Sequence, residues 1–138
     1  MTAFFDTNIL VYAQQTGTKA DRARTVLADG GRLGVQVLNE FTVVALRKLG
    51  KNWSEIAEVV DDALELFGPP LPVTFDLHVT ARALAESYQL SFYDALIVAA
   101  ALEAGCDTLY SEDMQHGQTV GNLRIQNPFI NSPQPGGA

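Results

Sequence analysis

The sequence predicts an α/β fold, a three-layer α/β/α sandwich around a mostly parallel sheet of about five strands. Short apolar runs alternate along the chain with longer segments in which apolar residues recur with helical spacing. Glycine or proline separates most of these segments. The chain has 138 residues, which is enough to bury one hydrophobic core, and it contains no internal repeat.

The N-terminal part of the chain is expected to form two short strands and three helices. Residues 2–5 are apolar and rich in aromatic rings, and this run ends abruptly at Asp6, as a buried strand does. Thr18 and Asp21 have the spacing of a capping box, and the helix they open should stop before Gly30. The expected elements are a strand over 2–5, a helix over 9–15, a helix over 18–29, a strand over 32–35 and a helix over 37–49.

The C-terminal part should continue the same alternation. Asn52 and Glu55 are spaced as a helix cap. Asp76 is expected to cap the helix over 77–88, which follows the strand over 72–75. Ser91 should open a helix that is apolar on nearly all sides and therefore central. The expected elements are a helix from the Asn52 cap to 67, a strand over 72–75, helices over 77–88 and 93–103, and strands over 108–111 and 123–126.

One domain is expected over residues 1–127, followed by a flexible tail over 128–138 that is rich in proline and glycine. No apolar run is long enough to span a bilayer, and the N-terminus lacks the basic start of a signal peptide. The single cysteine, Cys106, excludes an internal disulfide and fits a reducing cytoplasm, where we expect the protein to reside. The net charge of −7 argues against broad binding to nucleic acid through a basic face.

Four carboxylates are expected to meet at one rim of the sheet. Asp6 follows the first strand and Asp113 follows the strand over 108–111, while Glu40 and Asp94 lie near helix N-termini on the connections. Ligands of open α/β sheets bind outside the carboxyl ends of the strands. Like charges at such a rim repel unless a cation lies between them, and oxygen-only ligands favour Mg²⁺ or Mn²⁺ over zinc.

Three of the four acids also have a simpler explanation when they are taken alone, whereas an acid directly after a buried strand, such as Asp6, is usually functional in α/β folds. Asp94 lies three residues after Ser91, so it fits an ordinary helix N-terminus, and Glu40 fits a solvated helix surface. Asp113 fits a polar turn. Two basic groups, Lys19/Arg22/Arg24 and Arg47/Lys48/Lys51, are either solvated helix faces or parts of a groove that binds phosphates.

Four segments stand out along the chain: FFDTNIL over 4–10, VLNEF over 37–41, LSFYDALI over 90–97 and TLYSEDM over 108–114. In this order they resemble the motifs of PIN-domain ribonucleases, especially the VapC toxins of toxin–antitoxin pairs. The resemblance covers about residues 2–127 without a large insertion. One departure follows Asp113, where many relatives carry an aromatic residue and this chain continues with Met114.

The resemblance implies an endoribonuclease that depends on Mg²⁺ or Mn²⁺. By motif match, the metal and catalytic positions fall on Asp6, Glu40, Asp94 and Asp113, with Asn8 and Ser111 as polar supports. It also implies an RNA substrate, a homodimer, and inhibition by a small VapB-like antitoxin whose C-terminal segment occupies the active-site groove.

The sequence argues against two other enzyme classes and leaves two alternative functions open. Dehalogenase-type phosphatases and receiver domains need a second acid near Asp6 and a late lysine, whereas this chain has Asn8 and no lysine after Lys51. A PIN-like domain that only binds a partner, and a stand-alone nuclease without an antitoxin, are the remaining alternatives. The sequence does not identify the RNA that is cleaved.

Overall fold

The structure, a computed structural model, describes residues 1–130. Within these residues one strand is followed by six helices and then by three strands, so the regular alternation that the sequence predicts is not found. No helix in this part of the chain is long and apolar enough to cross a membrane. Within these residues the elements are β1 (Ala3–Phe5), α1 (Thr7–Ala13), α2 (Thr18–Ala28), α3 (Val35–Arg47), α4 (Trp53–Phe67), α5 (Phe75–Tyr88), α6 (Phe92–Glu103), β2 (Thr108–Tyr110), β3 (Thr119–Val120) and β4 (Leu123–Gln126).

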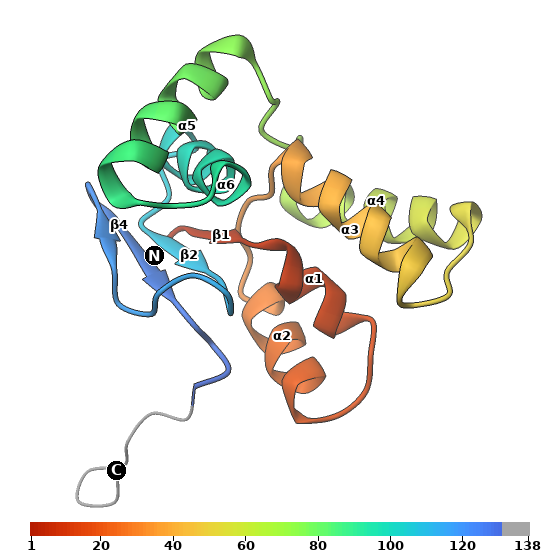
Figure 1. Cartoon of the computed structure of the whole chain (residues 1–138). Helices are drawn as coiled ribbons and strands as arrows, with labels where there is room; N and C mark the ends of the chain where they lie inside the picture. Colours follow the sequence, from red (N-terminus) through yellow and green to blue (C-terminus); the bar gives the residue numbers. More distant parts are fainter. Residues whose placement is uncertain (131–138) are drawn as a thin grey trace, which may run out of the picture.

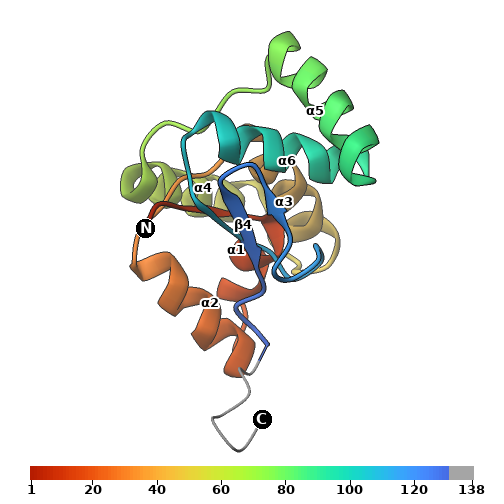
Figure 2. The same ribbon diagram turned by 90° about the vertical axis from the view of Figure 1, so that its left-hand side faces the viewer.

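The sheet has the strand order β1-β2-β4-β3. β1 pairs with β2 and β2 with β4 in parallel, and only the short β3 runs antiparallel to β4. Helices α5 and α6 lie on one face of the sheet, and α1 and α2 lie on the other (Figures 1 and 2). The predicted α/β class is confirmed, with four strands in the described residues where about five were expected.

Two predicted strands, over 32–35 and 72–75, are wrong as strands although they lie next to the sheet. Arg32 makes a single parallel bridge to Phe4, and Gly34 makes one to Leu71. The chain turns into α3 directly after Gly34, so the segment is too short to form a ladder. The segment over 72–75 likewise gives way to α5, which begins at Phe75. β3, which is only two residues long, was not expected at all.

The helix caps were predicted with mixed success. Asn52 and Glu55 form a complete capping box, and the Ser91 hydroxyl accepts from the backbone N–H of Asp94 at 3.3 Å, so both of these predictions are confirmed. The predicted box at Thr18 is wrong, because α2 is preceded by a glycine that offers no side chain. The predicted cap at Asp76 is also wrong, because the N-cap is Thr74, two residues earlier, whose hydroxyl accepts from Leu77 N–H.

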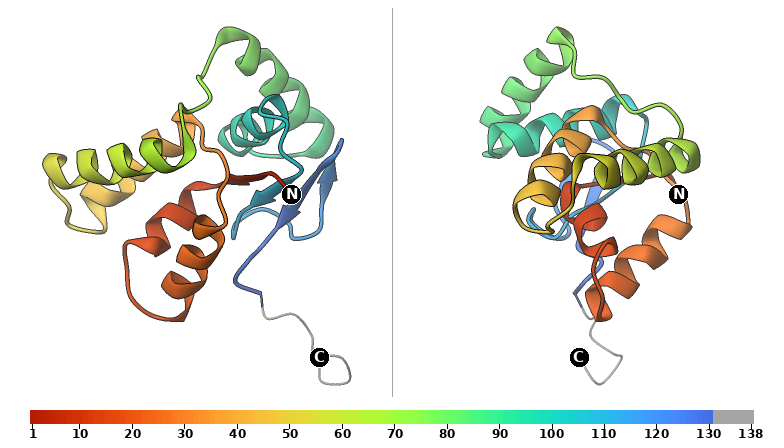
Figure 3. Two further views of the ribbon diagram at one scale, coloured as in Figure 1. Left: turned by 180° about the vertical axis from the view of Figure 1, so that it is seen from behind. Right: turned by 90° about the vertical axis from the view of Figure 1, so that its right-hand side faces the viewer.

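The helix pairs α1–α2 and α3–α4 lie beside β1, as Figure 3 shows from behind. The core between the layers is built from aromatic and aliphatic side chains, of which Phe4, Phe5 and Phe41 are completely buried. Residues 95–101 of α6 are all buried, as expected for a helix that is apolar on every side. Of the predicted tail, Pro128 accepts a hydrogen bond from Arg22 and Phe129 packs on Tyr12. Residues 131–138 lie outside the described residues.

Gly31 is required by the close approach of the chain to β1. A Cβ atom there would lie 2.6 Å from the Ala3 carbonyl oxygen and 2.6 Å from the Phe5 ring. Because a backbone atom cannot move away cheaply, we expect Gly31→Ala to lower the free energy of unfolding by roughly 2–3 kcal/mol. Gly30 is a matched control, since it has a φ of +88° and open space around it. Gly30→Ala should lower the free energy of unfolding by about 1 kcal/mol, because only the positive φ is unfavourable for alanine there.

Chemical denaturation of the two variants measures this difference. Equal destabilisation by Gly30→Ala and Gly31→Ala would contradict the packing argument, because only Gly31 faces β1.

Candidate active site

Asp6 lies at the junction of β1 and α1 and is the most buried of the four predicted carboxylates. Its exposed fraction is 3%. As the N-cap of α1, it accepts a hydrogen bond from Thr7 N–H at 2.7 Å, and the Ser111 hydroxyl donates to its other oxygen at 2.7 Å. Both oxygens are therefore fixed, one by the helix that follows and one by the loop after β2.

The pKa of Asp6 is raised to about 6, mainly by burial and to a smaller extent by the nearby carboxylates of Asp94 and Glu40. The hydrogen bonds from Ser111 and Thr7 act in the opposite direction but do not outweigh the loss of hydration. A buried carboxylate of this kind is costly in its charged form, and such groups gather at functional sites.

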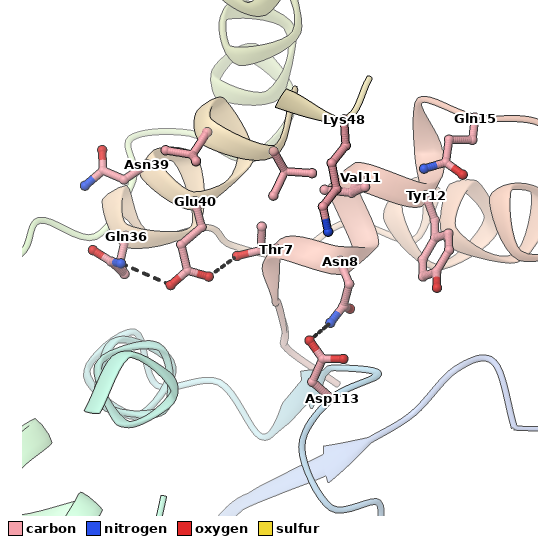
Figure 4. A pocket seen from close by; sticks show the side chains of 12 residues that line it. Thr7, Asn8, Val11, Tyr12, Gln15, Gln36, Asn39, Glu40, Lys48 and Asp113 are labelled. Atoms are coloured by element: carbon pink, nitrogen blue, oxygen red, sulfur yellow. Dashed lines mark hydrogen bonds between the residues drawn. The ribbon is translucent and has the colours of Figure 1, made fainter. Parts of the chain in front are cut away.

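Glu40 is half-buried on the first turns of α3 and is held from two sides. The Thr7 hydroxyl donates to its Oε1 at 2.8 Å, and the Gln36 amide donates to its Oε2 at 3.0 Å (Figure 4). Thr7 also lies next to Asp6 at the start of α1. Glu40 is thus tied to the same helix start as Asp6, which its position on a helix surface did not predict.

The loop after β2 carries Asp113, which is exposed, and Asn8 holds this loop. The Asn8 amide donates to Asp113 Oδ2 at 3.2 Å, and its oxygen accepts from Glu112 N–H at 3.2 Å. The Ser111 hydroxyl accepts from Met114 N–H at 3.2 Å while it donates to Asp6. Asn8 and Ser111 therefore contact two of the predicted carboxylates directly, as supports would.

Asp94 lies in the first turn of α6, half-buried, with its backbone capped by Ser91. Burial raises its pKa, and the carboxylates of Glu40 and Asp113 raise it as well. Asp6 and Asp94 also act on one another electrostatically. Asp94 is thus within electrostatic range of the other three predicted acids, which come from separate elements of the chain.

The donor set fits a hard divalent cation in its chemistry, since every ionisable group at the rim is a carboxylate. Within residues 1–130, however, no three carboxylate, imidazole or thiol groups are placed so that they could hold one ion as they stand. The carboxylates therefore surround the rim without forming a closed cage.

Several contacts that support the site were not expected from the sequence. Glu112 accepts from the Tyr12 hydroxyl at 2.6 Å and from the Lys19 ammonium at 2.5 Å, which anchors the loop of Asp113 to α1 and α2. Thr7 and Gln36 were not singled out either. The available signals were the position of Thr7 directly after Asp6 and the spacing of Gln36, one helical turn before Glu40.

A cavity of about 590 Å³ opens beside the rim, between α1 and α3. Figure 4 shows Glu40 and Asp113 at one side of it and Lys48 reaching down into it from α3. Asp6 and Asp94 do not line this cavity. The lining residues are Thr7, Asn8, Val11, Tyr12, Gln15, Gln36, Asn39, Glu40, Val43, Val44, Lys48 and Asp113.

Comparison with known proteins places the chain in a family. The model of the PIN domain matches residues 3–120. No curated protein matches the sequence. Among solved structures, a toxin–antitoxin complex from Klebsiella pneumoniae has a chain with 21% identity and a TM-score of 0.69, and the match covers 93% of this chain and 98% of that one.

Two further structures are similar. FitAcB from Neisseria gonorrhoeae has 18% identity and a TM-score of 0.64, with 93% of this chain and 99% of that chain covered. VapC20 from Mycobacterium tuberculosis, a toxin that cleaves the sarcin-ricin loop, has 20% identity and a TM-score of 0.64, with 81% and 90% covered. At these identities the similarity shows a shared fold.

Proposed function

Because the chain belongs to the PIN domain family, we propose that it is a metal-dependent endoribonuclease, the toxin of a VapBC-type toxin–antitoxin pair. The observation that carries the proposal is the convergence of Asp6, Glu40, Asp94 and Asp113 at one rim, where burial raises the pKa of Asp6 and of Asp94. A domain that only binds a partner has no need for a buried, desolvated carboxylate, so this feature favours catalysis.

The residues of the rim have separate roles in the proposed reaction. Asp6, Glu40, Asp94 and Asp113 would hold the ion. When bound there, Mg²⁺ or Mn²⁺ would orient the scissile phosphate and ionise the attacking water, so that the phosphodiester bond is hydrolysed. Ser111 and Thr7 fix the carboxylate of Asp6, and Asn8 fixes the loop of Asp113. These contacts hold the ligands in place before substrate arrives.

The partners of the protein belong to the same proposal. Two of the similar solved structures are a toxin–antitoxin complex and a VapC toxin that cleaves the sarcin-ricin loop. We therefore propose an antitoxin protein as inhibitor, RNA as substrate, a homodimer as the working form and the cytoplasm as its location. A stand-alone RNA-processing nuclease would share the rim but would have no antitoxin gene beside its own.

The test is expression in a bacterial host with and without Asp94→Asn, followed by mapping of the 5′ ends of cleaved RNA. We expect the unaltered chain to arrest growth and to produce discrete new 5′ ends, and Asp94→Asn to remove both. Asp76→Asn is the matched control, since Asp76 also lies in the first turn of a helix but is exposed on α5. Growth arrest that persists with Asp94→Asn would refute nuclease activity as the toxic principle.

A further inference from the structure

We propose that the cavity between α1 and α3 is a subsite for one unpaired nucleotide of the RNA substrate, next to the bond that is cleaved. This inference rests on the proposed function and names a part of the substrate other than the scissile phosphate. Thr7, Asn8, Glu40 and Asp113 belong both to the rim and to the cavity wall, so the two are continuous. A strand whose scissile phosphate lies at the rim would therefore place a neighbouring nucleotide in the cavity.

The size and the lining of the cavity suit a nucleobase. Its volume of about 590 Å³ lies within the roughly 300–1,000 Å³ of pockets that enclose small ligands. Val11, Val43 and Val44 provide an apolar surface on both helices, against which a flat ring can pack. Val43 is exposed, with 46% of its surface accessible, although it is a large aliphatic side chain in the middle of α3.

Lys48 supplies the charge that a nucleotide requires. Among the described residues that line the cavity it is the only cation, and no carboxylate in residues 1–130 forms a salt bridge with it. It projects from the end of α3 down into the cavity (Figure 4). A phosphate beyond the base would be neutralised there, while the scissile phosphate stays at the rim.

Two amides give the cavity the means to distinguish bases. Asn39 and Gln15 both line it and are exposed, and neither side-chain amide makes a hydrogen bond within the described residues. Gln36, in contrast, is already engaged with Glu40. Amide side chains present a donor and an acceptor together, which matches the edges of unpaired bases.

The shape of the cavity and the charge of the protein both favour single-stranded RNA. Stacked and paired bases cannot enter a cavity, so the nucleotide must be unpaired. The net charge of −7 leaves little electrostatic affinity for a nucleic-acid backbone in general. The affinity for RNA would therefore come from local contacts in the cavity, including the one with Lys48, rather than from a broad basic face.

The test measures binding without cleavage, using single-stranded octamers of A, C or U in the presence of a chelator. We expect Lys48→Ala to weaken binding about fivefold to tenfold at low salt and to reduce the slope of log Kd against log salt by about 1. Lys48→Arg should restore most of the affinity. Arg47→Ala is the matched control, because Arg47 is the exposed neighbour of Lys48 and does not line the cavity.

The second measurement follows the side-chain amide signals of Asn39 and Gln15 by NMR during the same titrations. Shifts of these signals, and a changed order of preference among the octamers in Asn39→Leu, would support the subsite. The subsite would be overturned if octamers bound without shifting the amide signals, or if Lys48→Ala and Arg47→Ala weakened binding equally. Either result would favour a protein partner as the occupant of the cavity. Binding at the cavity without metal-dependent cleavage would refute the proposed function alone, and cleavage without contact at the cavity would refute the inference alone.

Discussion

Asp6→Asn is expected to abolish RNA cleavage while making the folded protein more stable at neutral pH. The loss in kcat should be roughly 10²- to 10³-fold or more, the size that follows removal of a group that stabilises charge in the transition state. The fold should survive, because an asparagine oxygen can still accept from Thr7 N–H at the N-cap of α1. Loss of activity would therefore not reflect loss of structure.

The gain in stability follows from the raised pKa of Asp6. In the unfolded chain this carboxyl group ionises near 3.8, whereas burial raises the pKa in the folded protein to about 6. Between these values the folded state binds more protons than the unfolded state, so the stability of the protein falls as the pH rises through this range. Two pKa units correspond to about 3 kcal/mol of folding free energy, which the parent chain loses when Asp6 ionises. An uncharged asparagine at this position would not cause this loss.

Denaturant unfolding of both proteins between pH 4 and pH 8 measures this effect. The parent chain should lose stability up to about pH 6 and then level off as far as Asp6 is concerned, and Asp6→Asn should show a flatter profile. Asp76→Asn, at an exposed position of α5, should leave the slope unchanged. A parent profile that rises between pH 4 and pH 6 by as much as the variant profile does would contradict the raised pKa of Asp6.

The sequence predicted those parts of the site that depend on neighbouring residues. Asp6 could be found because an aromatic run stops at an acid, a local signal that a strand has ended. Ser91 and Asp94 could be found because helix caps depend on residues only three positions apart. Glu40 stood out only through its resemblance to a family motif, since nothing in its own helix marks it.

Contacts between distant segments could not be predicted in this way. The hydrogen bond from Thr7 to Glu40 joins residues 33 positions apart, and that from Asn8 to Asp113 joins residues 105 positions apart. The predicted strand over 32–35 failed for a related reason. Arg32 makes only one bridge to Phe4, and this pairing depends on how the two distant segments pack. The local sequence of 32–35 contains no pattern that would distinguish a single bridge from a full strand.

Mg²⁺ is expected to stabilise the protein, and this effect should disappear when Asp6 or Asp94 is changed to asparagine. An ion that binds only the folded state at 100 times its Kd adds about 2.7 kcal/mol to the free energy of unfolding. The reason lies in the rim itself, because a divalent cation would compensate for the lost hydration of Asp6 and Asp94 and for the repulsion between the carboxylates, which together raise both pKa values. Removal of the ion with a chelator should stop RNA cleavage.

The measurement is thermal unfolding at a series of Mg²⁺ concentrations, which needs no substrate. Asp76→Asn should respond as the parent chain does. Equal stabilisation of the parent, Asp6→Asn and Asp94→Asn would place the ion elsewhere on the acidic surface.

The response to Mg²⁺ should also depend on pH, because a protonated Asp6 offers the ion no charge. With its pKa near 6, Asp6 is mostly protonated at pH 5 and mostly ionised at pH 7.5. Mg²⁺ should therefore stabilise the protein more at pH 7.5, where the uncompensated carboxylate is most costly to the fold.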